Sequence, residues 1–89
     1  MPRRDRSKED IIAAMLQLLS QSPVESTYYI MYRAILGYIQ FKQYFELLRS
    51  KDLITRTANG AWFVTDKGRE YIHTYRELMR IIEDGYGKE

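Results

Sequence analysis

The feature that most constrains this chain is one change in its hydrophobic period, which occurs after Asp52. Before that residue, apolar side chains recur every three or four positions, as they do on one face of a helix. Residues 53–56 and 62–65 are instead rich in strand-forming residues, and they enclose Asn59-Gly60. Asn-Gly is typical of a type I′ hairpin turn, because both residues tolerate a positive φ angle. One β-hairpin is therefore expected between helical segments.

Three helices are expected before the hairpin. Ser7, with an acid three positions later, has the pattern of a capping box for a first helix over about Lys8–Leu19. A second, shorter helix should open near Ser26. Gly37 interrupts the pattern, and the third helix should then run over about Tyr38–Ser50. Two short helices around a glycine-containing turn predict a helix-turn-helix.

A fourth helix should follow the hairpin. Thr65 is a good capping residue, although Gly68 lowers the helix propensity of the first turn. Gly85 and Gly87 are natural stops, so this helix should end near Asp84. The predicted order is helix, helix, helix, strand, strand, helix. The fold class is mainly α with one small β-hairpin, and 89 residues leave room for a single core.

Composition argues against several classes of function. The chain has no cysteine, one histidine at position 73, and no carboxylate cluster at a loop or strand end. We therefore expect no catalytic residue, no metal site, no cofactor and no evident small-molecule ligand. No apolar run reaches the ~18 residues of a membrane span, and residues 1–10 lack the apolar stretch of a signal peptide. A cytoplasmic protein that is not an enzyme and has no membrane partner is expected.

The basic residues are unevenly distributed, although the net charge is only +2. Five basic residues from Arg33 to Arg56 meet only two acidic ones, whereas from Asp66 onward five basic residues meet six acidic ones. A basic cluster also precedes the first helix and could follow the phosphates of a nucleic acid. It consists of Arg3, Arg4, Arg6 and Lys8.

The third expected helix has two different faces. The inward face would carry Phe41, Phe45 and Leu48. The outward face would carry Ile39, Gln40, Lys42, Gln43 and Glu46. Its two glutamines suit the edges of bases, whereas Lys42 and Arg49 suit phosphates. Because Glu46 repels phosphates and Ile39 is apolar, composition alone leaves a solvated helix face as an equal alternative.

The hairpin offers a second candidate contact with nucleic acid. Arg56 and Asn59 lie on or beside it, where they could reach a minor groove or a phosphate backbone. The alternative is an ordinary hairpin that covers the core. Trp62 is expected to pack against the protein rather than to stack on a base, because an indole buries a large apolar area.

The fourth expected helix is more apolar than one small core requires. Its apolar residues step by three and four, as along a heptad seam. One edge of this stripe could pack on the domain and the other on a second copy, while the alternative is packing within one chain. The expected interface consists of Ile72, Tyr75, Leu78, Met79, Ile82 and Tyr86.

Three stretches of the sequence carry a family resemblance. They are Ile30-Met31-Tyr32-Arg33-Ala34, residues 38–48, and Thr65-Asp66-Lys67-Gly68-Arg69-Glu70-Tyr71. Together they resemble the archaeal winged helix-turn-helix proteins, which include the small dimeric "10a" DNA-binding proteins of Sulfolobus. The resemblance spans about residues 7–83, which is nearly the whole chain.

The resemblance implies a winged helix that binds duplex DNA. Residues 38–44, beginning with Tyr38, would be the recognition helix, Arg33 would lie where this helix approaches the DNA backbone, and residues 58–61 would be the tip of the wing. The last helix would pair with its copy in an antiparallel coiled coil. The family usually has polar residues at positions 35 and 39, a capping serine at 37 and a second lysine at 43. Here these positions hold Ile35, Ile39, Gly37 and Gln43, which makes the third helix less basic.

These observations predict a homodimeric protein that binds double-stranded DNA, as a transcription regulator or as an architectural protein of the nucleoid. The alternative is a winged helix that binds another protein and not DNA. The expected organisation is a flexible basic arm over residues 1–6, a winged helix-turn-helix over 7–65, a dimerisation helix over 66–84 and a flexible tail over 85–89.

Overall fold

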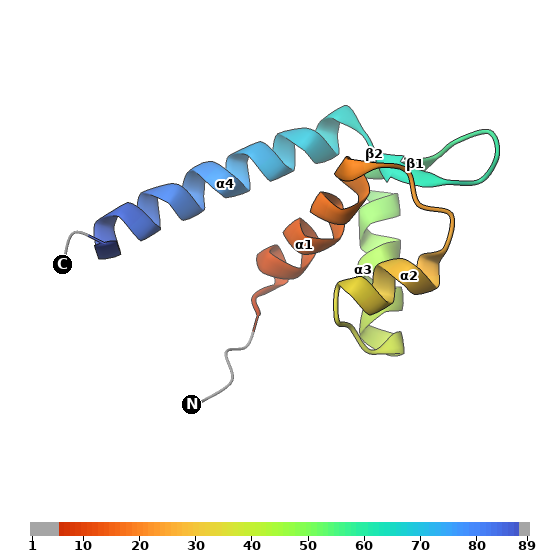
Figure 1. Cartoon of the computed structure of the whole chain (residues 1–89), viewed down its shortest axis with the longest axis horizontal. Helices are drawn as coiled ribbons and strands as arrows, with labels where there is room; N and C mark the ends of the chain where they lie inside the picture. The colour runs from red at the N-terminus through yellow and green to blue at the C-terminus, as the bar shows by residue number, and fades with distance from the viewer. Residues whose placement is uncertain (1–5, 88–89) are drawn as a thin grey trace.

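The computed structural model describes residues 6–87 and contains four helices and one hairpin in that range (Figure 1). The elements are α1 (Lys8–Gln21), α2 (Thr27–Arg33), α3 (Tyr38–Ser50), β1 (Ile54–Arg56), β2 (Trp62–Val64) and α4 (Asp66–Gly87). This order confirms the fold class predicted from the sequence. The bounds of α3 match the prediction, and α1 extends two residues past the expected end at Leu19.

Helix α1 lies at the centre of the fold, in contact with α2, α3, α4 and β2 (Figure 1). The predicted capping box is confirmed: the Asp10 amide donates to Ser7 Oγ at 3.0 Å, and the Ser7 amide donates to Asp10 Oδ2 at 3.1 Å. Met15, Leu16 and Leu19 are almost completely buried on its inner face. Burial of a side chain of this size contributes roughly 1.5–3 kcal/mol, so α1 supplies much of the stability of the core.

Helices α2 and α3 each end in a left-handed residue that is not glycine. Ile35 has φ 58° and Asp52 has φ 62°. After α2, the Leu36 amide donates to the Met31 carbonyl, and after α3 the Leu53 amide donates to the Leu48 carbonyl. This six-to-one hydrogen bond is the Schellman motif, in which the left-handed position is usually a glycine. The sequence did not predict a left-handed residue after either helix.

The hairpin has the predicted strands but a different turn. Strands β1 and β2 pair antiparallel, with Thr55 opposite Phe63. The prediction of a type I′ turn is wrong. That turn needs two residues with a positive φ, and in this described loop only Gly60 has one, of 90°. The loop has three residues, with the Gly60 amide bonded to the Thr57 carbonyl at 3.0 Å. The Thr57 hydroxyl donates to Asn59 Oδ1 and accepts from the Ala61 amide, and these bonds hold the longer loop.

A close approach of backbone to backbone places the start of α4 against the core. The predicted cap is present, since Thr65 Oγ1 accepts from the Gly68 amide at 3.1 Å and donates to the Asp52 carbonyl. A Cβ atom on Gly68 would lie 2.4 Å from the Leu53 carbonyl oxygen. Glycine is therefore required here for packing, a role that its low helix propensity does not reveal.

The middle of α4 packs against α1, and its far end projects from the domain (Figure 1). Tyr71 Oη donates to the Glu9 carbonyl at 3.0 Å, and Tyr75 donates to the Asp10 carboxylate. That hydrogen bond, together with burial, raises the pKa of Tyr75 to about 12. The helix continues to Gly87, three residues past the predicted end at Asp84, so residues 85–87 belong to the helix and not to a tail. Residues 88–89 lie outside the described range.

Residues 6–87 contain neither a membrane-spanning helix nor a metal-binding cluster. Over this range no helix combines the length and the apolar character needed to cross a membrane. The same residues contain no group of three His, Cys, Asp or Glu side chains placed to hold a metal ion.

Candidate nucleic-acid interface

Helix α3 presents one face to the core and the other to solvent, as predicted. Phe41 and Leu48 are buried and Phe45 is half-buried. The exposed side carries Ile39, Gln40, Lys42, Gln43 and Glu46. Its amide and ammonium groups can therefore meet a partner from solvent. The N-cap residue is Gly37, which has no side chain to accept a hydrogen bond from the backbone amides of the first turn of α3.

The cations of α3 differ in how they are held. The Lys42 ammonium lies 5.6 Å from the centre of the Tyr38 ring, one turn earlier on the same face. Arg49 donates to both carboxylate oxygens of Glu46, at 2.8 and 3.0 Å. Such an exposed pair contributes little to stability, but it partly neutralises the arginine that was predicted to contact phosphate. Lys42 is therefore the stronger candidate of the two.

The hairpin places a second cation on an aromatic ring. The Arg56 guanidinium lies 5.0 Å from the centre of the Trp62 ring, and its side chain is exposed. Trp62 in turn packs edge-on against Phe45 of α3, with 4.8 Å between ring centres. The prediction that Trp62 packs against the protein is confirmed. Asn59 lies at the exposed tip, where its side chain accepts the hydrogen bond from Thr57.

Two of the basic residues that were predicted to contact DNA, Arg6 and Arg33, form hydrogen bonds within the protein. Arg6 donates to the carbonyls of Ala34 and Ile35, at 2.8 and 3.0 Å, so it binds the C-terminal end of α2 instead of extending as part of an arm. Arg33 donates to Tyr29 Oη at 2.7 Å and lies over that ring. The remaining predicted arm residues, Arg3 and Arg4, lie outside the described residues.

The comparisons with known proteins agree with this arrangement. A family model described as winged helix-turn-helix matches residues 5–83. The chain belongs to this family. Helices α2 and α3 are thus the helix-turn-helix and the β1–β2 hairpin is the wing, and the family points to a protein that is not an enzyme. A comparison with curated proteins finds no match.

Two solved structures share the winged-helix fold. Sso10a-2, a DNA-binding protein from Sulfolobus solfataricus, is 20% identical, with a TM-score of 0.75 over 93% of this chain and 88% of that one. A mutant of ZitR from Lactococcus lactis is 14% identical, with a TM-score of 0.66 over 99% of this chain and 65% of that one. At these identities the likeness concerns the fold.

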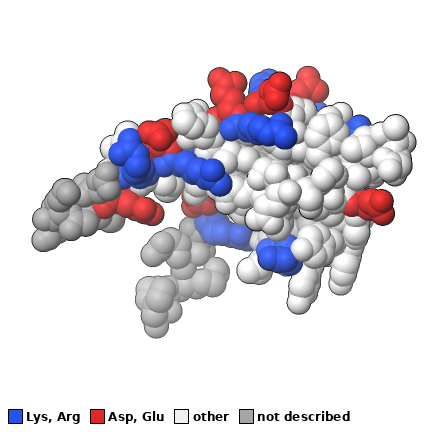
Figure 2. Space-filling model, turned by 45° about the horizontal axis from the view of Figure 1, so that its top comes forward, with Lys and Arg blue, Asp and Glu red and all other residues white. Residues whose placement is uncertain are grey.

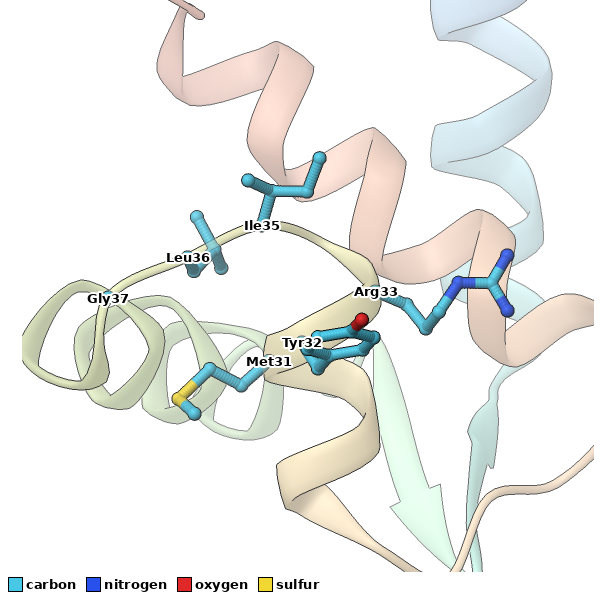
Figure 3. Close-up of a pocket in the computed structure, with 6 residues that line it drawn as sticks. All are labelled: Met31, Tyr32, Arg33, Ile35, Leu36 and Gly37. Carbon is cyan, nitrogen blue, oxygen red and sulfur yellow. The ribbon is translucent and has the colours of Figure 1, made fainter.

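The turn of this winged helix carries an apolar surface that the sequence pattern did not reveal. Tyr28 and Tyr32 are exposed on α2, in addition to the predicted Tyr38 and Ile39 on α3. A shallow open pocket of about 630 Å³ lies beside them (Figure 3). It is lined by Met31, Tyr32, Arg33, Ile35, Leu36 and Gly37. The spacing of Tyr28 and Tyr32, four residues apart and out of phase with buried Ile30, was the available signal.

Replacing Ile35 by glycine should stabilise the protein. The Ile35 side chain is 80% exposed, so removing it loses little buried apolar area. Its backbone has φ 58°, a conformation that is strained for a β-branched residue. Because left-handed backbone costs a non-glycine residue roughly 1–2 kcal/mol, and glycine adds entropy to the unfolded chain, the net gain should be about 0.5–1 kcal/mol. Urea unfolding would measure it, and a loss of stability would contradict the strain.

The stripe on α4 divides into core residues and exposed residues. Ile72 is only 5% exposed and packs in the core of its own chain, so its assignment to a dimer interface is wrong. The packing of α4 against α1 buries it, which helical spacing alone could not indicate. Met79 is half-buried, as is Tyr75, which binds Asp10. The side chain of Tyr86 lies outside the described residues.

Three apolar side chains remain exposed at the far end of α4. Leu78, Ile81 and Ile82 are 52%, 60% and 46% exposed. Ile81 was not predicted, although its spacing of three from Leu78 places the two on the same side of the helix. An apolar pocket of about 330 Å³ adjoins Leu78, between the start of α1 and α4. Its lining includes Tyr71, Tyr75, Leu78 and Met79.

Proposed function

We propose that this protein binds duplex DNA as a homodimer, with α3 in the major groove and the wing beside it. The observation that carries the proposal is the exposed side of α3, which carries Gln40, Gln43 and Lys42. Amide side chains read base edges and cations contact phosphates, so one face combines both kinds of contact. Arg56 adds a cation on the wing. The winged-helix family and the DNA-binding protein Sso10a-2 support the same function.

The proposed dimer uses the far end of α4. Leu78, Ile81 and Ile82 lie towards the end of a helix that projects from the domain (Figure 1), and each is about half exposed. A second α4, packed alongside, would bury all three residues on each copy. Such a dimer would hold two recognition helices at a fixed distance, which suits either a transcription regulator or an architectural protein of the nucleoid.

Removing the two exposed cations should weaken binding to duplex DNA. In Lys42→Ala/Arg56→Ala we expect the affinity to fall about tenfold or more at low salt. Each lost phosphate contact means that fewer counterions are released when the protein binds. The slope of log affinity against log salt should become less steep by about 2. Fluorescence anisotropy on a mixed-sequence duplex over a salt series measures both quantities. Lys67→Ala/Arg76→Ala removes the same charge from α4 and serves as the matched control.

The exposed Ile35 and Ile39 favour one alternative, a winged helix that binds another protein. Absence of a duplex complex at low salt, or affinity that does not change with salt, would overturn the DNA proposal. If both the Lys42/Arg56 and the Lys67/Arg76 variants lost the same affinity for duplex DNA, the assignment of the DNA-binding surface to α3 and the wing would be contradicted. Absence of DNA binding together with a stable protein complex would support the alternative.

A further inference from the structure

Three tyrosine side chains of the helix-turn-helix are largely exposed to solvent. Tyr28 and Tyr32 lie one turn apart on α2 and are 69% and 70% exposed, and Tyr38, at the start of α3, is 65% exposed. Among the described residues, no hydrogen bond occupies their three hydroxyls. We call these three residues the tyrosine surface. Large aromatic side chains of this kind usually bury most of their area, so their exposure points to a ligand.

The charge around the tyrosine surface indicates what kind of ligand fits it. Residues 26–45 contain no aspartate and no glutamate, while Arg33 and Lys42 lie within that stretch. The Lys42 ammonium lies against the Tyr38 ring itself. On the face shown in Figure 2, most charged side chains lie along α4, and few lie at the opposite end of the molecule. Glu25 and Glu46 lie just outside this stretch. Exposed flat rings with cations beside them complement a polyanion that has flat rings of its own.

We propose that the tyrosine surface binds single-stranded DNA, with unpaired bases stacked on Tyr28, Tyr32 and Tyr38 and phosphates near Arg33 and Lys42. Bases in a duplex already stack on one another, so their faces are closed to these rings. Unpaired bases offer those faces, and base–aromatic stacking tolerates any sequence. The inference rests on the proposed DNA binding in one respect, which is that Lys42 contacts phosphate, and it names unpaired DNA as a further substrate.

The intact protein can be tested by fluorescence anisotropy with an oligothymidylate of about 20 nucleotides and a duplex of about the same length. Wild type should bind the oligothymidylate at least as tightly as the duplex. Tyr28→Ala/Tyr32→Ala should lower the single-strand affinity by about 100-fold, or about tenfold per ring, and change the duplex affinity by less than about twofold. Circular dichroism verifies the fold of each variant. Tyr28→Phe/Tyr32→Phe keeps the rings and should bind as wild type does.

The outcomes separate this inference from the proposed function. Single-strand binding without duplex binding would support the inference and overturn the duplex proposal, whereas duplex binding alone would overturn only the inference. Equal loss in the alanine and phenylalanine variants would show that the hydroxyls act and would overturn stacking. Loss of self-association in the alanine variant, with no single-strand binding in wild type, would make the surface an interface between copies and overturn the inference.

Discussion

Replacing Leu78 and Ile82 together by glutamate should convert the proposed homodimer into a monomer. The two side chains lie four residues apart on α4, each about half exposed, and in the proposed dimer they face the second copy. A carboxylate placed in an apolar interface without a partner costs several kcal/mol, so four of them per dimer should weaken association by more than about 100-fold. Sedimentation equilibrium over a range of concentrations measures the change.

The control and a second readout make this test specific. His73→Glu places a negative charge on an exposed position of the same helix, outside the apolar stripe, and should leave the dimer intact. Met79→Glu is less informative, because Met79 is half-buried against its own chain and the variant would also disturb folding. Duplex affinity should fall together with dimerisation, since two linked recognition helices bind more tightly than one. A wild-type monomer at high concentration would contradict the dimer.

Replacing Gly68 by alanine should destabilise the protein by about 2–3 kcal/mol. The new Cβ would lie 2.4 Å from the Leu53 carbonyl oxygen and 3.0 Å from Val64 Cγ1, and the first of these contacts is with rigid backbone. Relief requires α4 to move away from the hairpin, which is an overpacking cost of this size. Helix propensity alone predicts the opposite sign, a gain of about 1 kcal/mol. The sign of the change therefore decides between packing and propensity.

Thermal or urea unfolding of two matched variants gives the answer. Gly37→Ala makes the same chemical change where no atom lies within 4 Å of the added Cβ and φ is −71°. Its free energy of unfolding should differ from wild type by less than about 1 kcal/mol, because the weaker cap and the lower entropy of the unfolded chain oppose each other. Similar changes in both variants would refute the role of the close contact at Gly68.

Local interactions explain why so much of the fold was predictable. The capping box joins Ser7 to a residue three positions away, and the bounds of α3 follow from the spacing of Phe41, Phe45 and Leu48 on one face. The hairpin strands follow from their strand-forming residues on either side of Gly60. Each of these signals depends on residues within a few positions, where backbone and side-chain preferences act directly.

The candidate site was predictable only in part, because its composition depends on which side chains other elements cover. The exposed face of α3 could be deduced from its own periodicity. The tyrosine surface was missed, because the spacing of Tyr28 and Tyr32 separates them from buried Ile30 but does not show how far the packing of α2 on α1 leaves them exposed. Arg6 was predicted in a basic arm, but it binds carbonyls 28 and 29 residues away.

The sequence by itself determined the order of the elements, the caps of α1 and α4, and the two-faced character of α3, because these depend on neighbours along the chain. Only the tertiary structure decided that Ile72 belongs to the core while Leu78 and Ile82, which were predicted in the same apolar stripe, stay about half exposed. It also decided that Gly68 is a packing residue and that Ile35 is strained. The physical reason is common to all of these: burial and close approach are properties of contacts between distant segments, which local preference does not encode.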